Sequence, residues 1–156
     1  MIFMIIDRGH PGSVCLRSLR LEPLRAQKRA VRPVLAADTT VCIGRIILGK
    51  PADAGEARRM LTLLAGKTHR VLTAIALARG ARIEMAVSES RVTFAALSRN
   101  QIDAYIGTGE PFDKAGGYGI QGYAGTMISH LSGSYSGVMG LPVHETARLL
   151  GTRAAA

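Results

Sequence analysis

The sequence lacks tryptophan and has few aromatic residues of any kind, with aromatics at 4% of 156 residues. A core must therefore rest on aliphatic side chains and methionine. Cysteine is also scarce. Cys15 and Cys42 form no C-x-x-C pair, so nothing indicates the disulfide framework of a small secreted domain. This pattern fits a reducing compartment, and we expect a cytoplasmic protein.

Long apolar runs are missing as well. None reaches the roughly 18 residues that a membrane-spanning helix requires, so we expect no segment that spans a membrane and no membrane partner. The apolar residues 1–6 have no basic flank before them and are followed by Asp7 and Arg8. This arrangement favours a first strand over a signal peptide.

What is present is ordinary globular composition, 47% hydrophobic and 20% charged, over a length that suits one domain. The net charge of +9 indicates an anionic partner, such as a nucleotide, a nucleic acid or a membrane surface, or else a generally arginine-rich surface. A basic patch with interleaved aromatic residues, as an RNA-binding sheet would carry, is missing. Its absence argues against a nucleic-acid partner.

Hydrophobic patterning predicts strands mixed with helices, and hence an α/β domain with a mixed sheet. Residues 34–43 have the pattern of a buried strand in which Asp38 is the only charge. Asp53 and Ser98 each precede a Glu or Gln by three residues, which predicts two helix starts. The other expected elements are strands over 70–78 and 127–131, a hairpin pair over 83–87 and 91–96, and helices over 14–30 and 143–150.

Residues 44–51 (GRIILGKP) nearly match a phosphate-binding P-loop. Pro51 occupies the place of the Ser or Thr that binds Mg²⁺, and it disfavours a helical conformation at Lys50. A P-loop is therefore excluded. Lys50, held between a glycine and a proline, either neutralises a phosphate or is a plain turn lysine.

Two further features favour phosphate and base chemistry. Asp38, in its apolar strand, suits Mg²⁺ binding or water activation, or else it caps a turn. Residues 113–122 (DKAGGYGIQG) form a glycine-rich loop whose N–H groups can approach phosphates or a base, unless it is only a surface loop. Gln121 offers an amide donor and acceptor, which suits the imide edge of uracil or thymine.

Read together, these stretches resemble the Maf family of nucleoside triphosphate pyrophosphatases. Five sequence words carry the resemblance, in the family's order and near its spacing: residues 35–41 (LAADTTV), 47–51 (ILGKP), 60–74 (MLTLLAGKTHRVLTA), 110–122 (EPFDKAGGYGIQG) and 133–142 (GSYSGVMGLP). We therefore expect a single domain over residues 1–156. Within it, residues 34–150 are family-like and residues 1–33 are a divergent N-terminal segment.

The resemblance implies an elongated α/β fold around a mixed sheet, similar to the inosine triphosphate pyrophosphatases. It implies two lobes around a cleft, with the N-terminal part incomplete. The implied reaction is hydrolysis of a nucleoside triphosphate to the monophosphate and pyrophosphate, with a divalent metal cation, Mg²⁺ or Mn²⁺, as cofactor.

The resemblance also assigns roles to residues. Asp38 corresponds to the family's proton acceptor and is the expected metal ligand. Lys50 and Lys114 correspond to the lysines of the family's GKP and DKAG words, which we expect to bind substrate phosphates. Thr39 and Gln121 occupy the two positions that track substrate preference, and this pair is similar to the dTTP/UTP branch.

The sequence departs from the family pattern before Asp38. An arginine-bearing Ser-x-Ser-Pro-Arg-Arg loop and a later Asp-Glu pair have no match there. A dTTP/UTP pyrophosphatase is the leading hypothesis. One alternative is a catalytically impaired relative that binds nucleotides or a protein partner, linked to septum formation. Another is a nucleic-acid binder that uses the basic N-terminus, and a homodimer is left open.

Overall fold

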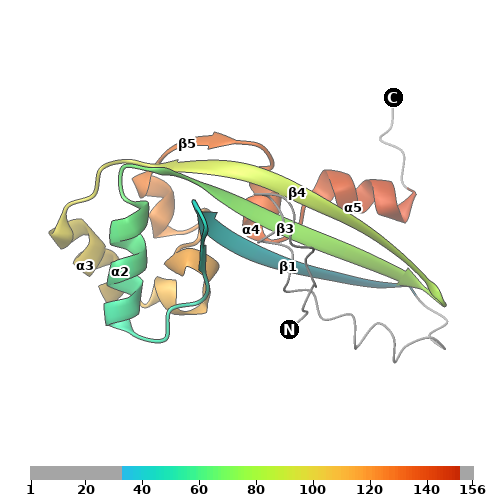
Figure 1. Ribbon diagram of the computed structural model, residues 1–156, viewed down its shortest axis with the longest axis horizontal. Helices are drawn as coiled ribbons and strands as arrows, with labels where there is room; N and C mark the ends of the chain where they lie inside the picture. The colour runs from blue at the N-terminus through green and yellow to red at the C-terminus, as the bar shows by residue number, and fades with distance from the viewer. Residues whose placement is uncertain (1–32, 152–156) are drawn as a thin grey trace.

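The computed structural model describes residues 33–151, which are built around one five-stranded sheet of order β2-β1-β3-β4-β5. The strands are β1 (Val34–Ile43), β2 (Ile46–Leu48), β3 (Thr68–Arg79), β4 (Arg82–Phe94) and β5 (Ile128–Ser132). The long strands β1, β3 and β4 cross most of the molecule (Figure 1). The α/β class is thus confirmed. Every pairing within residues 33–151 is antiparallel, so the parallel pairing that a mixed sheet needs is not among them.

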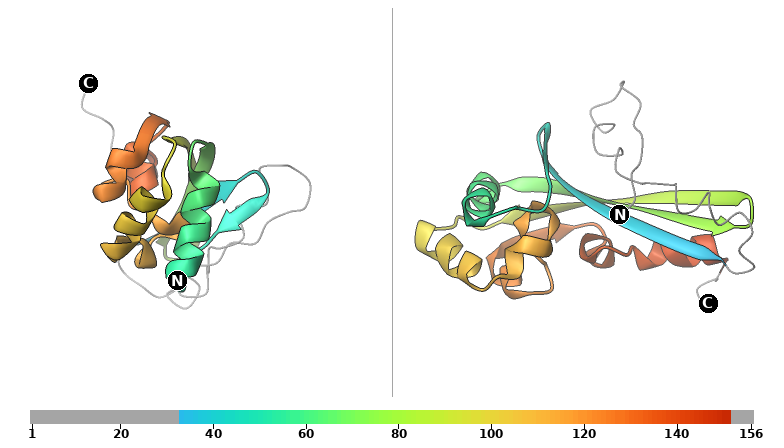
Figure 2. Two further views of the ribbon diagram at one scale, coloured as in Figure 1. Left: turned by 90° about the vertical axis from the view of Figure 1, so that its left-hand side faces the viewer. Right: turned by 90° about the horizontal axis from the view of Figure 1, so that it is seen from below.

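The helices divide the described residues into two parts. They are α2 (Ala54–Leu64), α3 (Arg99–Gly107), α4 (Tyr135–Met139) and α5 (Val143–Leu150). The pair α2 and α3 lies at one end of the long strands, together with the 3₁₀ turns η2 (Glu110–Asp113), η3 (Ala115–Gly117) and η4 (Tyr123–Met127). The pair α4 and α5 lies along one side of the sheet (Figure 2, right).

Both predicted helix starts are confirmed. The Asp53 carboxylate accepts the backbone N–H of Glu56 at 2.7 Å and begins α2. Ser98 and Gln101 form a reciprocal capping box at the start of α3, since each side chain accepts the other residue's backbone N–H. Such caps satisfy backbone donors that have no partner inside the helix.

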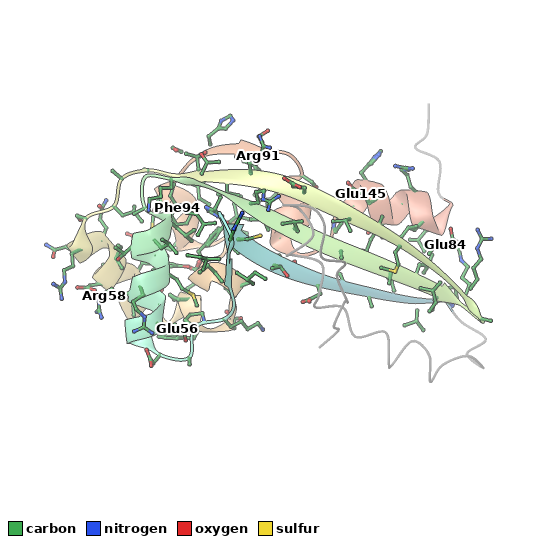
Figure 3. The ribbon with its side chains drawn as sticks, viewed as in Figure 1. Glu56, Arg58, Glu84, Arg91, Phe94 and Glu145 are labelled. Carbon is green, nitrogen blue, oxygen red and sulfur yellow. The ribbon has the colours of Figure 1, made fainter. Side chains whose placement is uncertain are left out.

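The main core lies at the α2 end of the sheet. Leu61 and Leu64 of α2 and Tyr105 of α3 are fully buried there, beside Phe94 at the end of β4. Figure 3 shows Phe94 directed into the space beside α2, whereas Glu84 lies near the far turn of the sheet. Toward the far end, a small cluster of alanines contacts a few partly buried residues, and Ile75 and Leu77 of β3 are buried as well. The α2 end therefore holds most of the buried apolar volume.

One predicted element differs from the structure, and two observed elements were not predicted. The expected hairpin over 83–87 and 91–96 is a single 13-residue strand, β4, and the turn lies instead between β3 and β4 at Gly80, where φ is +60°. The short strand β2 and the helix α4 were not predicted. The expected helix over 14–30 lies outside the described residues.

Two expectations about chemistry and location can be compared with the fold. Within residues 33–151, no helix has the length and apolarity needed to cross a bilayer. Cys42 on β1 is buried and is not a free thiol, while Cys15 lies outside the described residues. The absence of a disulfide, suggested by the cysteine count, is therefore not confirmed.

Candidate active site

A cleft of about 200 Å³ lies where the two parts of the structure meet. All five residues singled out from the sequence line it: Asp38, Thr39, Lys50, Lys114 and Gln121. They come from three segments of the chain, namely β1, the turn after β2, and the glycine-rich loop after α3. The fold thus brings together side chains separated by up to 83 positions in sequence.

Asp38 and Thr39 lie in the middle of β1. They face Ala74 and Thr73 of β3 in the ladder. Consecutive strand residues point to opposite faces of a sheet. Both can line one cleft because β2 pairs only with residues 41–43, which leaves β1 as the sheet edge at Asp38 and Thr39.

Thr39 is held by a hydrogen-bond chain that leads from the cleft into the buried interior. Its hydroxyl lies 2.8 Å from the Thr73 hydroxyl on β3. Thr73 in turn donates to the backbone carbonyl of Gly137 in α4, at 2.6 Å. The chain ties the cleft residue to the neighbouring strand and, through it, to the helix on the same side of the sheet.

Helix α4 packs closely on β3 and β4 because two glycines allow it. A Cβ on Gly133 would lie 2.7 Å from the Ser90 hydroxyl, and a Cβ on Gly137 would lie 3.0 Å from the Ser88 hydroxyl. Ser90 also accepts the backbone N–H of Ser134 at 2.9 Å. This contact places Val138 and Met139 of α4 in the cleft wall.

The glycine-rich loop is anchored to the sheet at Gly116. Its N–H donates to the Gly49 carbonyl at 2.9 Å. Its φ is +74°, and a Cβ there would lie 2.9 Å from a methyl group of Val41 on β1. Only glycine combines this backbone conformation with so close an approach. Lys50, next to Gly49, is thereby held near the loop that carries Lys114.

Both lysines act on the carboxylate of Asp113. Lys114 donates to Asp113 at 2.5 Å. This hydrogen bond, assisted by the positive charge of Lys50, lowers the pKa of the exposed Asp113 carboxyl. Lys50 and Lys114 thus bring two cations to a cleft that the Asp113 and Asp38 carboxylates also line. Lysines can donate to phosphate oxygens.

Glu110 holds the part of the loop that carries Gln121. Its carboxylate accepts the Tyr105 hydroxyl at 2.9 Å and the backbone N–H of Tyr123 at 2.9 Å. It also packs against Gly122, where a Cβ would lie only 2.3 Å from a carboxylate oxygen. Burial and the bond to Glu110 raise the pKa of Tyr105, so the phenol stays a donor. Gln121, directly before Gly122, is exposed at the cleft.

Tyr118 connects the loop to the sheet through His69 on β3. The Tyr118 hydroxyl lies 2.7 Å from His69 Nε2, and both rings make edge-to-face contacts with Phe94. Burial lowers the pKa of His69 to about 4 and raises the pKa of the Tyr118 phenol. Both groups are therefore neutral near pH 7, and the bond adds no charge to the cleft.

The cleft residues fit a divalent cation that arrives with its substrate. Residues 33–151 hold no cluster of three or more His, Cys, Asp or Glu side chains suited to a metal. Asp38 and Asp113 line the cleft, and Asp38 forms no ion pair with any described residue. Mg²⁺ is commonly bound by one or two carboxylates together with substrate phosphates. The two cleft carboxylates within residues 33–151 match that mode.

Sequence reasoning missed the residues that act behind the cleft. Thr73 is the one polar residue in the apolar run 71–78 of β3, and that contrast was the available signal. Glu110 opens the fourth sequence word, yet nothing in the sequence shows that its carboxylate meets Gly122. Both contacts depend on segments that fold back on one another.

The chain matches the family model described as Maf-like protein over residues 16–153, and it belongs to that family. It is similar to a protein named dTTP/UTP pyrophosphatase from Polaromonas sp. (strain JS666 / ATCC BAA-500), with 52% identity over 152 residues, 94% of this chain and 75% of the relative. A protein of the same name from Albidiferax ferrireducens is 55% identical over 130 residues, 83% of this chain and 65% of the relative. A third, from Methylobacillus flagellatus, is 56% identical over 145 residues, 93% of this chain and 68% of the relative. The chain thus spans about two thirds to three quarters of the length of these relatives.

Proposed function

We propose that this chain hydrolyses dTTP and UTP to the nucleoside monophosphate and pyrophosphate. The observation that carries the proposal is the single cleft that gathers Asp38, Thr39, Lys50, Lys114 and Gln121. The names of relatives that are about half identical to this chain support the same activity. A cytoplasmic location and a homodimer stay predictions.

The phosphate end of the cleft has the charges that phosphoryl transfer requires. Water attacks the α-phosphorus, the bond to the bridging oxygen breaks, and negative charge grows on the departing pyrophosphate. Lys50 and Lys114 stabilise that charge, because fixed cations act strongly on charge that develops in a partly desolvated site. Asp38 orients the water and takes its proton.

A divalent cation is part of the proposal. Asp38 would hold it together with substrate oxygens, and it would neutralise charge on the phosphates. Whether Mg²⁺ or Mn²⁺ serves better is decided by comparing the two in the assay below.

The base end is formed by Thr39 and Gln121. Uracil and thymine present an N–H between two carbonyl groups, and a hydroxyl together with a primary amide can satisfy such an edge. Such partners discriminate strongly once the bound base removes them from water, because a base that fails to pair then leaves them unsatisfied.

The test is pyrophosphate release from a panel of nucleoside triphosphates with Mg²⁺ or Mn²⁺. We expect release from dTTP and UTP, and a fall in kcat/KM of about 100- to 10,000-fold in Asp38→Asn, which keeps the side-chain shape but loses the charge. The matched control is Asp103→Asn, since Asp103 pairs with Arg58 between α3 and α2, outside the cleft.

Two results would count against the proposal. No release from folded wild-type protein would leave a binding protein of the Maf family as the better description. Equal loss of activity in Asp38→Asn and Asp103→Asn would show that the effect comes from folding and not from the cleft carboxylate.

A further inference from the structure

The hydroxyl chain behind the cleft has a fixed direction, which follows from counting its protons. Thr73 has one hydroxyl proton, and its oxygen lies 2.6 Å from the Gly137 carbonyl oxygen. A carbonyl oxygen cannot donate, so the Thr73 proton must lie in that bond. Without it, two acceptor oxygens would face each other at 2.6 Å.

The direction of the second bond follows from the first. The Thr39 and Thr73 hydroxyl oxygens lie 2.8 Å apart, and the Thr73 proton is already used. Thr39 must therefore donate its own proton to Thr73. The Thr39 oxygen is left with lone pairs alone for the cleft, so it meets a ligand as an acceptor.

The surroundings keep this arrangement rigid. Thr73 is fully buried on the central strand β3, directly opposite Thr39 in the ladder. The Gly137 carbonyl is a main-chain atom of α4, held against Ser88 by close packing. Linked hydrogen bonds in a buried site polarise one another, which strengthens the acceptor character of the last oxygen.

We infer that Thr73 is a positioning residue that fixes Thr39 as a hydrogen-bond acceptor and so selects pyrimidines with a ring N3–H. The inference rests on the proposed function, because it places the base at Thr39. Uracil and thymine offer an N–H at ring position 3, whereas cytosine has a lone pair there. A cytosine in the same pose would bring two acceptors together, which costs affinity.

Removal of the Thr73 hydroxyl should free Thr39 from donating its proton to Thr73. In Thr73→Val the Thr39 proton loses its acceptor and can turn toward the cleft, where Thr39 can donate to cytosine N3. The Gly137 carbonyl is not orphaned, because it keeps the N–H of Gly140 at 3.1 Å. Valine also matches threonine in branching and suits a strand.

The experiment measures kcat/KM for UTP and CTP, and equilibrium dissociation constants for both nucleotides with EDTA present, on the full chain. We expect the UTP-over-CTP ratio to fall about tenfold in Thr73→Val, the effect of roughly one ordinary hydrogen bond. Thr73→Ser, which keeps the hydroxyl, retains the ratio. Thr73→Ala provides a second hydroxyl-free variant if the valine protein does not fold.

The chain supplies a matched control. Thr68 and Thr93 form another hydroxyl pair at 2.8 Å between β3 and β4, away from the cleft. Thr93→Val removes one hydroxyl of that exposed pair, and the UTP-over-CTP ratio should stay at the wild-type value. Thermal unfolding of each variant separates loss of stability from loss of selectivity.

The inference is overturned if the ratio is equal in wild type and the hydroxyl-free variants, or if wild type prefers neither nucleotide. It is also overturned if Thr73→Ser loses the ratio as fully as Thr73→Val. If wild type releases no pyrophosphate but binds UTP more tightly than CTP, and Thr73→Val abolishes that difference, the proposed activity fails while the selection mechanism stands.

Discussion

The two walls of the cleft are held in place by different means. The sheet wall, formed by Asp38 and Thr39 on β1, is fixed by a continuous strand ladder with β3. The loop wall, formed by residues 110–122, has no ladder and depends on a few contacts: Gly116 with Gly49 and Val41, Glu110 with Tyr123, and Tyr118 with His69. Single substitutions should therefore displace the loop wall far more easily than the sheet wall.

The sharpest way to break the loop wall is Gly116→Ala. We expect a loss of about 4 kcal/mol in the free energy of unfolding, from left-handed backbone strain and from the clash with Val41. Urea denaturation measures the change. Gly109→Ala is the control. Gly109 has φ +77°, but no atom lies within 4 Å of an added Cβ, so this variant should show the left-handed backbone strain without a clash. Equal losses in both variants would mean that the approach to Val41 is unimportant.

The His69–Tyr118 contact between the walls predicts a pH dependence of stability. The pKa of His69 is about 4 in the folded protein against 6.5 ordinarily, so the unfolded chain binds more protons between these values. Stability is therefore full above pH 6.5 and falls as pH drops toward 4, by about 3 kcal/mol from this group.

Denaturation at several pH values tests the contribution of His69. In His69→Phe the part of the stability loss between pH 6.5 and 4 that comes from His69 should vanish. Replacement of the exposed His130 by Gln should leave that loss in place. If the free energy of unfolding of His69→Phe falls with decreasing pH as steeply as that of wild type, the pH dependence comes from other groups, for instance the carboxylates.

The smallest expected effect is that of Glu110→Gln, which tests one of the contacts that hold the loop wall. Glu110→Gln keeps the shape of the side chain but weakens its bonds to Tyr105 and the Tyr123 N–H, at about 1 kcal/mol. Because these bonds position Gln121, KM for UTP should rise about fivefold while kcat changes little. Glu84→Gln, in the surface ion pairs near the far turn, is the control. A fall in kcat at constant KM would contradict a role in holding the base.

Local patterns predicted much of the framework, and together with the family resemblance they singled out the five residues that line the cleft. Strand β1 and helices α2, α3 and α5 follow from hydrophobic runs and capping residues, which act over a few positions. The division of β4 was wrong because polar and charged residues near its middle resemble a turn, while β3 and β4 pair through them. Helix α4 is only five residues long and rich in glycine and serine, so no periodic signal marks it.

The parts of the site that sequence did not reveal depend on distant contacts. Thr39 and Thr73 are 34 positions apart, and Tyr123 meets Glu110 across 13. Such long-range contacts depend on strand register and on the conformation of the loop, and the local sequence around one residue predicts neither. The roles assigned to the five cleft residues, and the division into residues 1–33 and 34–150, stay predictions.

The origin of the hydroxyl chain in a peptide carbonyl limits how this site can change over evolutionary time. Every residue type keeps its main-chain oxygen, so no substitution at Gly137 can remove the acceptor or turn it into a donor. A descendant that prefers a different base edge must therefore change Thr39 or Thr73 themselves. Substitutions elsewhere in α4 can alter the stability of the protein, but Thr39 still meets the base as a hydrogen-bond acceptor.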